Sequence, residues 1–144
     1  MDNLARPHLD DFPFAISQTL RFADTDQYGH VTNSVFASLC QSGRIAVLGD
    51  PANPLAPSGT QFNLARLEID FCHEMHWPGT VDIATGIAAI GRSSLTLTQA
   101  LFCQARCVAT ARSVVVLTEH ATRRSFALSD DLKRKLQWLT TTGT

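Results

Sequence analysis

The strongest constraint on the fold is the spacing of apolar residues in 34–48, which is that of an amphipathic helix. Most other apolar runs in the chain have the composition of strands. Five apolar or small residues recur in 34–48 at three- and four-residue steps and so share one helix face: Phe36, Leu39, Cys40, Gly43 and Val47. Gly49 is placed to end the helix, and Thr32, Asn33 or Ser34 to cap its start. Gly43 costs about 1 kcal/mol relative to Ala inside a helix. We therefore expect another backbone to pack closely against it.

The remaining apolar runs are rich in Val, Ile, Leu and Thr and are separated by turn residues. They predict strands over residues 16–22, 64–71, 81–90, 95–102 and 107–117. Residues 50–59 contain three prolines and predict a loop, and residues 130–139 predict a short C-terminal helix. One helix followed by several antiparallel strands is an α+β pattern, in which a curved sheet wraps around a long central helix. We expect one domain over residues 1–144, with a leader over 1–15 and a core over 16–139.

Composition excludes several classes of protein. The 144 residues fit one domain, and 44% of them are hydrophobic, enough for a core. The net charge of −1 gives no basic field for nucleic acid or anionic lipid. No apolar run reaches the roughly 20 residues of a membrane span, and no secretory signal is evident at the start, so a cytoplasmic location is expected. We expect the four cysteines to be reduced and mostly buried.

The chemistry is most concentrated in residues 24–30, where two carboxylates, Asp24 and Asp26, and His30 directly precede the predicted helix. A helix N-terminus offers free N–H groups and a partial positive charge, which stabilise a developing oxyanion. A carboxylate beside it can attack an acyl carbon or activate water. Acidic loops before helices are also common as simple caps. The spacing therefore suits acyl transfer without requiring it.

The string LRFADTDQYGHVTNSVF, residues 20–36, resembles the signature of the 4-hydroxybenzoyl-CoA thioesterase-like branch of the hot-dog-fold superfamily. The similarity continues through LEIDF at 67–71, PGTV at 78–81 and RSSLTL at 92–97, and it covers roughly residues 16–136. Arg44 matches the Ala-Arg position that usually ends the helix motif. The resemblance implies a hot-dog fold, a helix wrapped by an antiparallel sheet, and acyl thioester hydrolysis.

The same resemblance implies roles for individual residues. Asp26 occupies the position of the catalytic carboxylate, and the backbone N–H of Asn33 that of the group polarising the thioester carbonyl. Substrate contacts are expected for Tyr28, Gly29 and His30 of the same loop. Arg92 is a further candidate, for the nucleotide phosphates of coenzyme A, because arginine can donate to phosphate through two N–H groups. Simpler interpretations exist for two of these residues. His30 can instead fix the loop by hydrogen bonding, and Arg92 can be an arginine that contacts only solvent. Asp24 is expected to order the loop and to be directed away from Asp26, because two nearby carboxylates raise one pKa.

The sequence also departs from the family pattern. Thr32 stands where Asn is usual, Phe36 where Tyr is usual, and Thr80 where Asp is frequent. Residues 35–48 contain no Asp or Glu, which disfavours the branch that uses a glutamate on the helix. That absence points back to Asp26 as the catalytic carboxylate.

Residues 72–76, Cys-His-Glu-Met-His, contain ligand types for a metal, but zinc usually takes four ligands and no partner pair with suitable spacing is evident. A turn at the end of a strand is the simpler interpretation, and no metal is expected. The family resemblance places this region near the substrate entrance, where it can support substrate selection.

The sequence therefore predicts an acyl-CoA or acyl-carrier thioesterase that needs no cofactor and forms a homodimer or dimer of dimers. Two alternatives stay open. One is a non-catalytic module that binds acyl thioesters, and the other is a hydratase or dehydratase on the same fold. Neither the acyl group nor the choice between nucleophile and general base for Asp26 follows from the sequence.

Overall fold

The computed structural model describes residues 6–52 and 54–141. The regular elements, in chain order, are η1 (Leu9–Asp11), β1 (Phe14–Thr19), η2 (Phe22–Asp24), α1 (Asn33–Leu48), β2 (Thr60–Phe71), β3 (Thr80–Ile90), β4 (Ser94–Cys103), β5 (Arg106–Glu119), α2 (Asp130–Leu136) and η3 (Gln137–Leu139). The strands form one antiparallel sheet in the order β1-β3-β4-β5-β2. The predicted α+β fold is confirmed, with a helix of 16 residues against the sheet.

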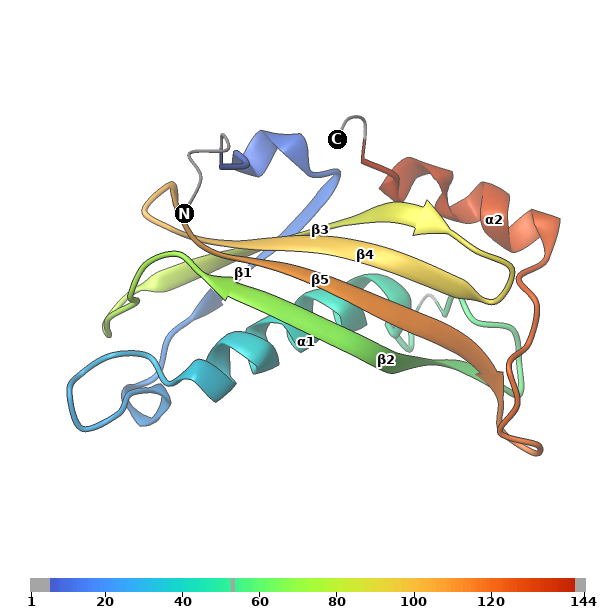
Figure 1. The fold of residues 1–144 in the computed structure, drawn as a ribbon, viewed down its shortest axis with the longest axis horizontal. Coiled ribbons are helices and arrows are strands. Elements are labelled where there is room, and N and C mark those ends of the chain that lie inside the picture. Colours follow the sequence, from blue (N-terminus) through green and yellow to red (C-terminus); the bar gives the residue numbers. More distant parts are fainter. Residues whose placement is uncertain (1–5, 53, 142–144) are drawn as a thin grey trace.

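Figure 1 shows α1 running along one face of the sheet. The N-terminal half of α1 packs on the end of the sheet where β3 begins and β4 ends, through Phe36, Leu39 and Cys40. Its C-terminal half, Val47 and Leu48, joins an apolar cluster at the other end, which also contains leucines of α2 and η3. The helix thus runs from one end of the sheet to the other, and its N-terminus is fixed near the start of β3.

Gly43 lies on the face of α1 that packs against side chains of β3 and β4. A Cβ there would meet three side chains, Ile83 Cγ2 at 2.6 Å, Gln99 Nε2 at 2.8 Å and Thr85 Oγ1 at 2.9 Å. The expectation of a close backbone is therefore wrong, because the neighbours are side chains of β3 and β4. Gln99 is 1% exposed and donates from Nε2 to the Cys40 carbonyl at 2.9 Å and to Thr85 Oγ1 at 3.0 Å. The missing side chain of Gly43 makes room for this buried hydrogen-bonded glutamine.

The other face of the sheet carries a smaller apolar cluster beneath the N-terminal segment. Leu9 and Phe12 pack against Ala84, Ala100 and Phe102 there. The Phe12 and Phe102 rings meet edge to face, with centroids 6.4 Å apart. The described part of the predicted leader therefore lies along the domain, and the leader's last two residues belong to β1.

Element boundaries differ from the prediction at several places. The first strand ends at Thr19 rather than residue 22, because residues 22–24 form a 3-10 turn. β2 begins at Thr60, four residues before its predicted start, because it pairs with β5 as far as Glu119. The C-terminal helix ends at Leu136 and continues as the 3-10 turn η3.

Two further expectations concern cysteines and membranes. The four cysteines are free, with Cys40 and Cys107 buried and Cys72 and Cys103 half-buried. Within residues 6–52 and 54–141, no helix combines the length and apolar character required for a membrane span.

Candidate active site

The loop before α1 is a closed turn held by its own backbone. Thr25 and Val31 form an antiparallel bridge. The Asp26 N–H donates to the His30 carbonyl at 2.8 Å, and the Gly29 N–H donates to the Asp26 carbonyl at 3.0 Å. Gly29 has φ +79°, a left-handed conformation that side chains with a Cβ rarely adopt. These backbone hydrogen bonds therefore hold Asp26 and His30 opposite each other at the two ends of the turn.

The Asp26 side chain is exposed, and one of its oxygens is used by the loop. Oδ1 accepts from the Tyr28 N–H at 2.8 Å and from the His30 N–H at 3.1 Å. Among the described residues, Oδ2 of Asp26 has no hydrogen-bond partner. One oxygen thus orients the carboxylate, and the other is free to meet a ligand.

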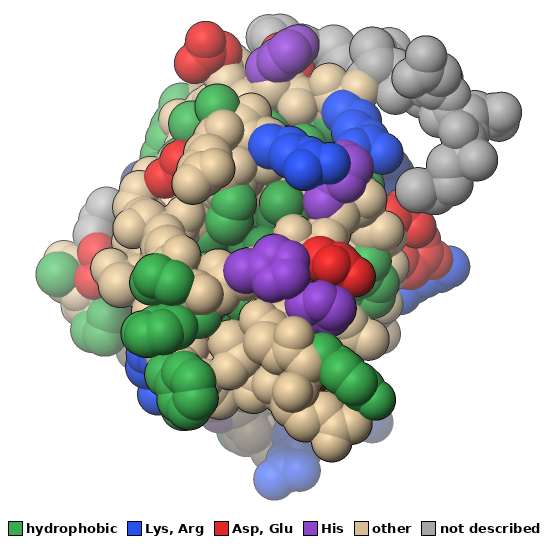
Figure 2. Space-filling view, turned by 90° about the vertical axis from the view of Figure 1, so that its left-hand side faces the viewer, with side chains coloured by type: hydrophobic (Ala, Val, Ile, Leu, Met, Phe, Trp, Pro, Cys, Tyr) green, Lys and Arg blue, Asp and Glu red, His purple; other side chains and the backbone are tan. Residues whose placement is uncertain are grey.

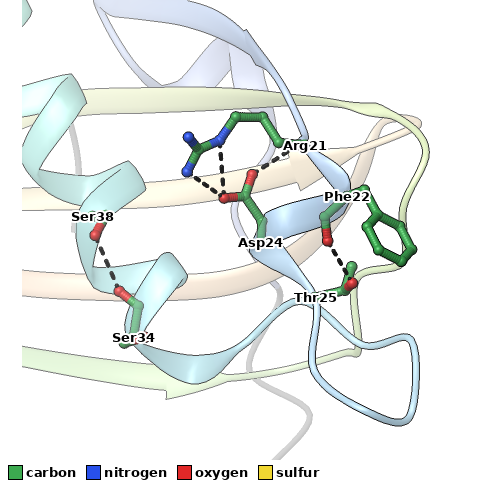
Figure 3. Close-up of polar contacts among 6 residues, drawn as sticks. All are labelled: Arg21, Phe22, Asp24, Thr25, Ser34 and Ser38. Atoms are coloured by element: carbon green, nitrogen blue, oxygen red, sulfur yellow. Dashed lines mark hydrogen bonds and ion pairs between the residues drawn. The ribbon is translucent and has the colours of Figure 1, made fainter.

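Asp24 has a different environment. It is 5% exposed, and its carboxylate accepts from the Arg21 N–H at 2.8 Å, from Arg21 Nη2 at 2.9 Å and from Arg21 Nε at 3.3 Å. Figure 3 shows the Arg21 side chain folded back over Asp24, and a hydrogen bond from Thr25 Oγ1 to the Phe22 carbonyl in the same turn. These bonds from Arg21 lower the pKa of Asp24. Asp24 therefore orders the loop, as expected from the sequence.

The N-terminus of α1 opens beside this loop. The helix begins at Asn33, and its N-cap residue Thr32 makes no side-chain capping bond. Within the described residues, no acceptor takes up the backbone N–H of Asn33 or of Ser34. Figure 3 shows Ser34 and Ser38 further along the helix, where the Ser38 hydroxyl donates to the Ser34 carbonyl at 3.3 Å. Free first-turn N–H groups are the standard means by which a helix binds an anion or a polarised carbonyl.

A cavity of about 300 Å³ joins these groups. Its wall contains Asp26, His30, Val31, Asn33, Phe36, Phe71, Cys72, His73 and Glu74. A carboxylate, a helix N-terminus and two aromatic side chains thus face one space. A larger cavity of about 410 Å³ lies between the C-terminal half of α1 and the start of β2, and its wall includes neither Asp26 nor Asn33. We assign the chemistry to the smaller cavity because it contains the groups able to perform it.

Part of the cavity wall follows β2, in the region that the family resemblance places near the substrate entrance. Phe71 ends the strand, and residues 72–75 form a non-strand segment before the bridge at His76, so the predicted turn is confirmed. The Phe36 and Phe71 rings meet edge to face, with centroids 5.1 Å apart. The sequence indicates this segment only through the polar and metal-ligand residue types of 72–76. Their contact with the Asp26 loop depends on packing between residues far apart in the chain.

Basic side chains border the cavity at His73. Arg106 Nη2 lies 2.6 Å from His73 Nδ1, and Arg6 contacts the same ring. Desolvation and the two guanidinium groups lower the pKa of His73, so the ring favours its neutral form. Figure 2 views the molecule from this end and shows basic side chains beside histidine and acidic ones. The guanidinium groups of Arg6 and Arg106 therefore place positive charge beside His73, at the rim of the cavity.

The sequence matches the model of a thioesterase-like superfamily over residues 20–136. The chain belongs to the thioesterase-like superfamily. The resemblance noted for residues 20–36 is thereby confirmed at the level of the superfamily. No curated protein matches this chain.

Solved structures share the fold of this superfamily member over nearly its whole length. The PA5185 protein from Pseudomonas aeruginosa PAO1 is 21% identical with a TM-score of 0.85, and the match covers 96% of this chain and 99% of that one. A protein from Bacillus stearothermophilus described as a predicted thioesterase is 26% identical with a TM-score of 0.81, covering 91% and 98%. A thioesterase from Thermus thermophilus, crystallised with coenzyme A and Zn, is 25% identical with a TM-score of 0.77, covering 88% and 98%.

In this thioesterase-like chain the residues expected at the site separate into two groups. Asp26, His30 and Asn33 line the cavity. Tyr28 and Gly29 belong to the same loop but not to the cavity wall, and Tyr28 is 73% exposed. The loop therefore supplies both the carboxylate that lines the cavity, Asp26, and the turn that holds it.

Arg92 lies elsewhere in the same chain. It is in the turn between β3 and β4, and its carbonyl accepts from the Leu128 N–H at 2.8 Å. That turn is at the end of the sheet where β3 finishes, whereas the cavity is at the end where β3 starts. A contact between Arg92 and a substrate in this cavity stays a prediction.

Proposed function

We propose that this protein hydrolyses acyl thioesters, with Asp26 as the functional carboxylate and the first turn of α1 as the site that polarises the carbonyl. The observation that carries the proposal is the shared cavity, in which Asp26 and Asn33 face one space of about 300 Å³. Membership of the thioesterase-like superfamily supports the reaction class. Catalysis then depends on groups that are oriented before the substrate arrives.

The chemical steps follow from the two groups. The thioester oxygen accepts from the Asn33 N–H, which stabilises the negative charge that develops on it. In one route Asp26 takes a proton from water, the hydroxide adds to the carbonyl carbon, and the C–S bond breaks as the thiol leaves with that proton. In the other route Asp26 itself adds and the C–S bond breaks, giving an acyl-aspartyl anhydride and a thiolate. Water then cleaves the anhydride, which releases the acid, restores the Asp26 carboxylate and supplies the proton that the thiolate takes up. Both routes use the free Oδ2 of Asp26.

We further propose a coenzyme A or acyl-carrier thioester as substrate, in keeping with the 4-hydroxybenzoyl-CoA thioesterase-like branch. The coenzyme A complex of the Thermus thermophilus thioesterase supports this assignment. The two guanidinium groups at His73 are placed to pair with phosphate, because arginine offers a fork of donors to phosphate oxygens. No resident cofactor is needed for either route of hydrolysis.

The leading alternative is a module that binds acyl thioesters without cleaving them. The hydrogen bonds from Tyr28 and His30 to Oδ1 of Asp26 support it, because they give that carboxylate a structural role. Under this alternative, acyl-CoA would bind while the concentration of free thiol stayed constant. The hydratase or dehydratase alternative has no such support, and the absorbance of a trans-2-enoyl thioester would test it.

The deciding experiment compares the wild type with Asp26→Asn on a panel of aryl and short- to long-chain acyl-CoAs. The amide oxygen of Asn can still accept from Tyr28 and His30, so the loop is preserved while the base or nucleophile is removed. We expect kcat for thiol release to fall by about two orders of magnitude or more. Asp130→Asn, at an exposed aspartate on α2, is the matched control and should retain wild-type rates.

The readout must separate substrate thiol from protein thiol. Cys72 and Cys103 are half-buried free cysteines and will react with a thiol reagent, so loss of thioester absorbance should be followed in parallel. If the wild type binds acyl-CoA and cleaves none of the panel, the binding module replaces the hydrolase. If Asp26→Asn cleaves as fast as the wild type, Asp26 is not the catalytic group.

A further inference from the structure

We propose that His30, Glu74 and His76 form a binding site for a divalent transition-metal ion, with zinc the best match, on the rim of the Asp26 cavity. The site follows from the geometry and does not depend on the proposed hydrolysis. No metal is expected from the sequence, because residues 72–76 have no partner pair at a spacing typical of zinc sites. His30 is far from residues 74–76 along the chain. Only the fold brings the three side chains together.

Two backbone segments are held side by side at this point. His30 and His76 form an antiparallel bridge, and the Val31 N–H donates to the Met75 carbonyl at 2.8 Å. Val31 and Met75 are both buried in the core below the bridge. Because side chains alternate along extended backbone, burying Met75 directs its two neighbours, Glu74 and His76, to the outer side. The site is therefore fixed by core packing.

The three ligand atoms lie close enough for one ion. Glu74 Oε2 is 3.2 Å from His30 Nε2 and 3.6 Å from His76 Nε2, and no two ligand atoms are more than 4.8 Å apart. Tetrahedral zinc with bonds of about 2.0–2.2 Å places its ligands roughly 3.4 Å from one another. The two separations from Glu74, 3.2 and 3.6 Å, lie on either side of that value.

The donor set suits zinc over magnesium or calcium. Two imidazole nitrogens and one carboxylate are ligands that zinc shares with neighbouring transition metals, whereas magnesium and calcium prefer oxygen alone. Three protein ligands leave a fourth position for water or another ligand. The side chains of His30, Glu74 and His76 are 35%, 66% and 57% exposed, so an ion can reach them from solvent. In Figure 2, histidine and acidic side chains gather at the centre of this end of the molecule.

Simple ion pairing does not account for the whole arrangement. An exposed Glu–His pair contributes little to stability, and one histidine would suffice for it. Here a second histidine is held against the first, with ring centroids 4.9 Å apart. The bridge thus brings both rings and one carboxylate within reach of a single cation.

The position of the ion links two parts of the candidate active site. His30 and Glu74 both line the cavity that contains Asp26. The backbone of His30 also accepts from the Asp26 N–H and donates to Asp26 Oδ1. A bound ion would therefore fasten the Asp26 loop to the segment after β2, and it should stabilise the folded state because it binds that state preferentially.

The test measures zinc binding to chelator-treated full-length protein by competition with a metal indicator. We expect one ion per chain for the wild type. Loss of a ligand, in His76→Ala or Glu74→Gln, should weaken binding by more than the roughly 10- to 100-fold typical of outer-shell partners. His120→Ala, at an exposed histidine outside the cluster, is the matched control and should bind as the wild type does.

Two further readouts do not depend on activity. Zinc should raise the Tm of the wild type and of His120→Ala, but not that of His76→Ala or Glu74→Gln. Cobalt should give the intense visible absorption of a four-coordinate ion with the wild type and with His120→Ala, but not with the two ligand variants. If the wild type takes up no zinc, or if the ligand variants bind as tightly as the wild type, the site does not exist. Circular dichroism of each variant checks that it is folded.

Discussion

Single residues decide how closely the parts of this molecule approach one another. Gly43 admits Gln99 beneath α1, and Gly29 gives the Asp26 loop its left-handed turn. Asp24 and Asp26 are two positions apart, but one is buried against Arg21 while the other is exposed at the cavity. Two identical side chains thus acquire different environments from their surroundings: Asp24 is held in an ion pair, and Asp26 lines the cavity.

Gly43→Ala should destabilise the protein. The added Cβ would lie under 3.0 Å from Ile83, Thr85 and Gln99, and displacing Gln99 would disturb its bond to the Cys40 carbonyl. Overpacking typically costs about 1–3 kcal/mol, and the better helix propensity of Ala returns about 1 kcal/mol of that. We expect a net loss of up to about 2 kcal/mol in the free energy of unfolding, measured with urea. Ser42→Ala, one position earlier, is the control, and a Gly43→Ala protein as stable as that control would contradict the packing argument.

Asp24→Asn should change how stability depends on acid. The pKa of Asp24 is lowered in the folded state, so its charged form contributes stability above the unfolded pKa of about 3.9. That contribution is lost as pH falls through the folded pKa. The wild type should therefore exceed Asp24→Asn in unfolding free energy at pH 7, and the gap should shrink below about pH 5. Urea unfolding at a series of pH values measures the gap, and a gap that stays constant to about pH 3 would count against the Arg21 contact.

At the scale of elements, the sequence predicts those whose periodicity is local. The helix was expected over residues 34–48 and is Asn33–Leu48, because its apolar face and Gly49 mark it within the string itself. The first strand was misplaced because the apolar residues Leu20 and Phe22 prolong its pattern. Leu20 is buried beyond the end of β1, whereas Phe22 enters the Asp24 turn and lies against Trp77. A capping contact between Arg21 and Asp24 overrides the alternation there.

The candidate site was predictable only as far as it is local. Asp26 and Asn33 lie within one motif, so the sequence can place them together. The same cavity also contains Phe71, His73 and Glu74, which are placed there by the pairing of β2 with β5 and by the bridge at His76. Both are contacts between residues far apart in the sequence, so the local spacing of residues does not predict them. The convergence of His30 with Glu74 and His76 is unpredictable for the same reason.

At the scale of the whole molecule, the sheet has two unpaired edges, β1 and β2, within the part of the chain that the structure describes. β2 is 12 residues long, and only β5 pairs with it within the described chain. Leu64 on β2 is exposed and also borders the larger cavity beside α1. A long edge strand with exposed apolar side chains favours pairing with another strand. We therefore propose that two copies associate through β2 and extend the sheet.

This proposal makes the oligomeric state sensitive to Leu64. Leu64→Glu should convert the dimer to monomer, because it removes an exposed apolar side chain from the pairing strand and places a charge there in both copies, which opposes edge-to-edge pairing. Phe126→Glu changes an equally apolar exposed residue outside β2 and should leave the dimer intact. Light scattering after size-exclusion chromatography reports the mass of each species. If the wild type is a monomer, the proposed pairing through β2 is wrong. If Leu64→Glu stays dimeric, the dimer interface lies on a surface other than β2.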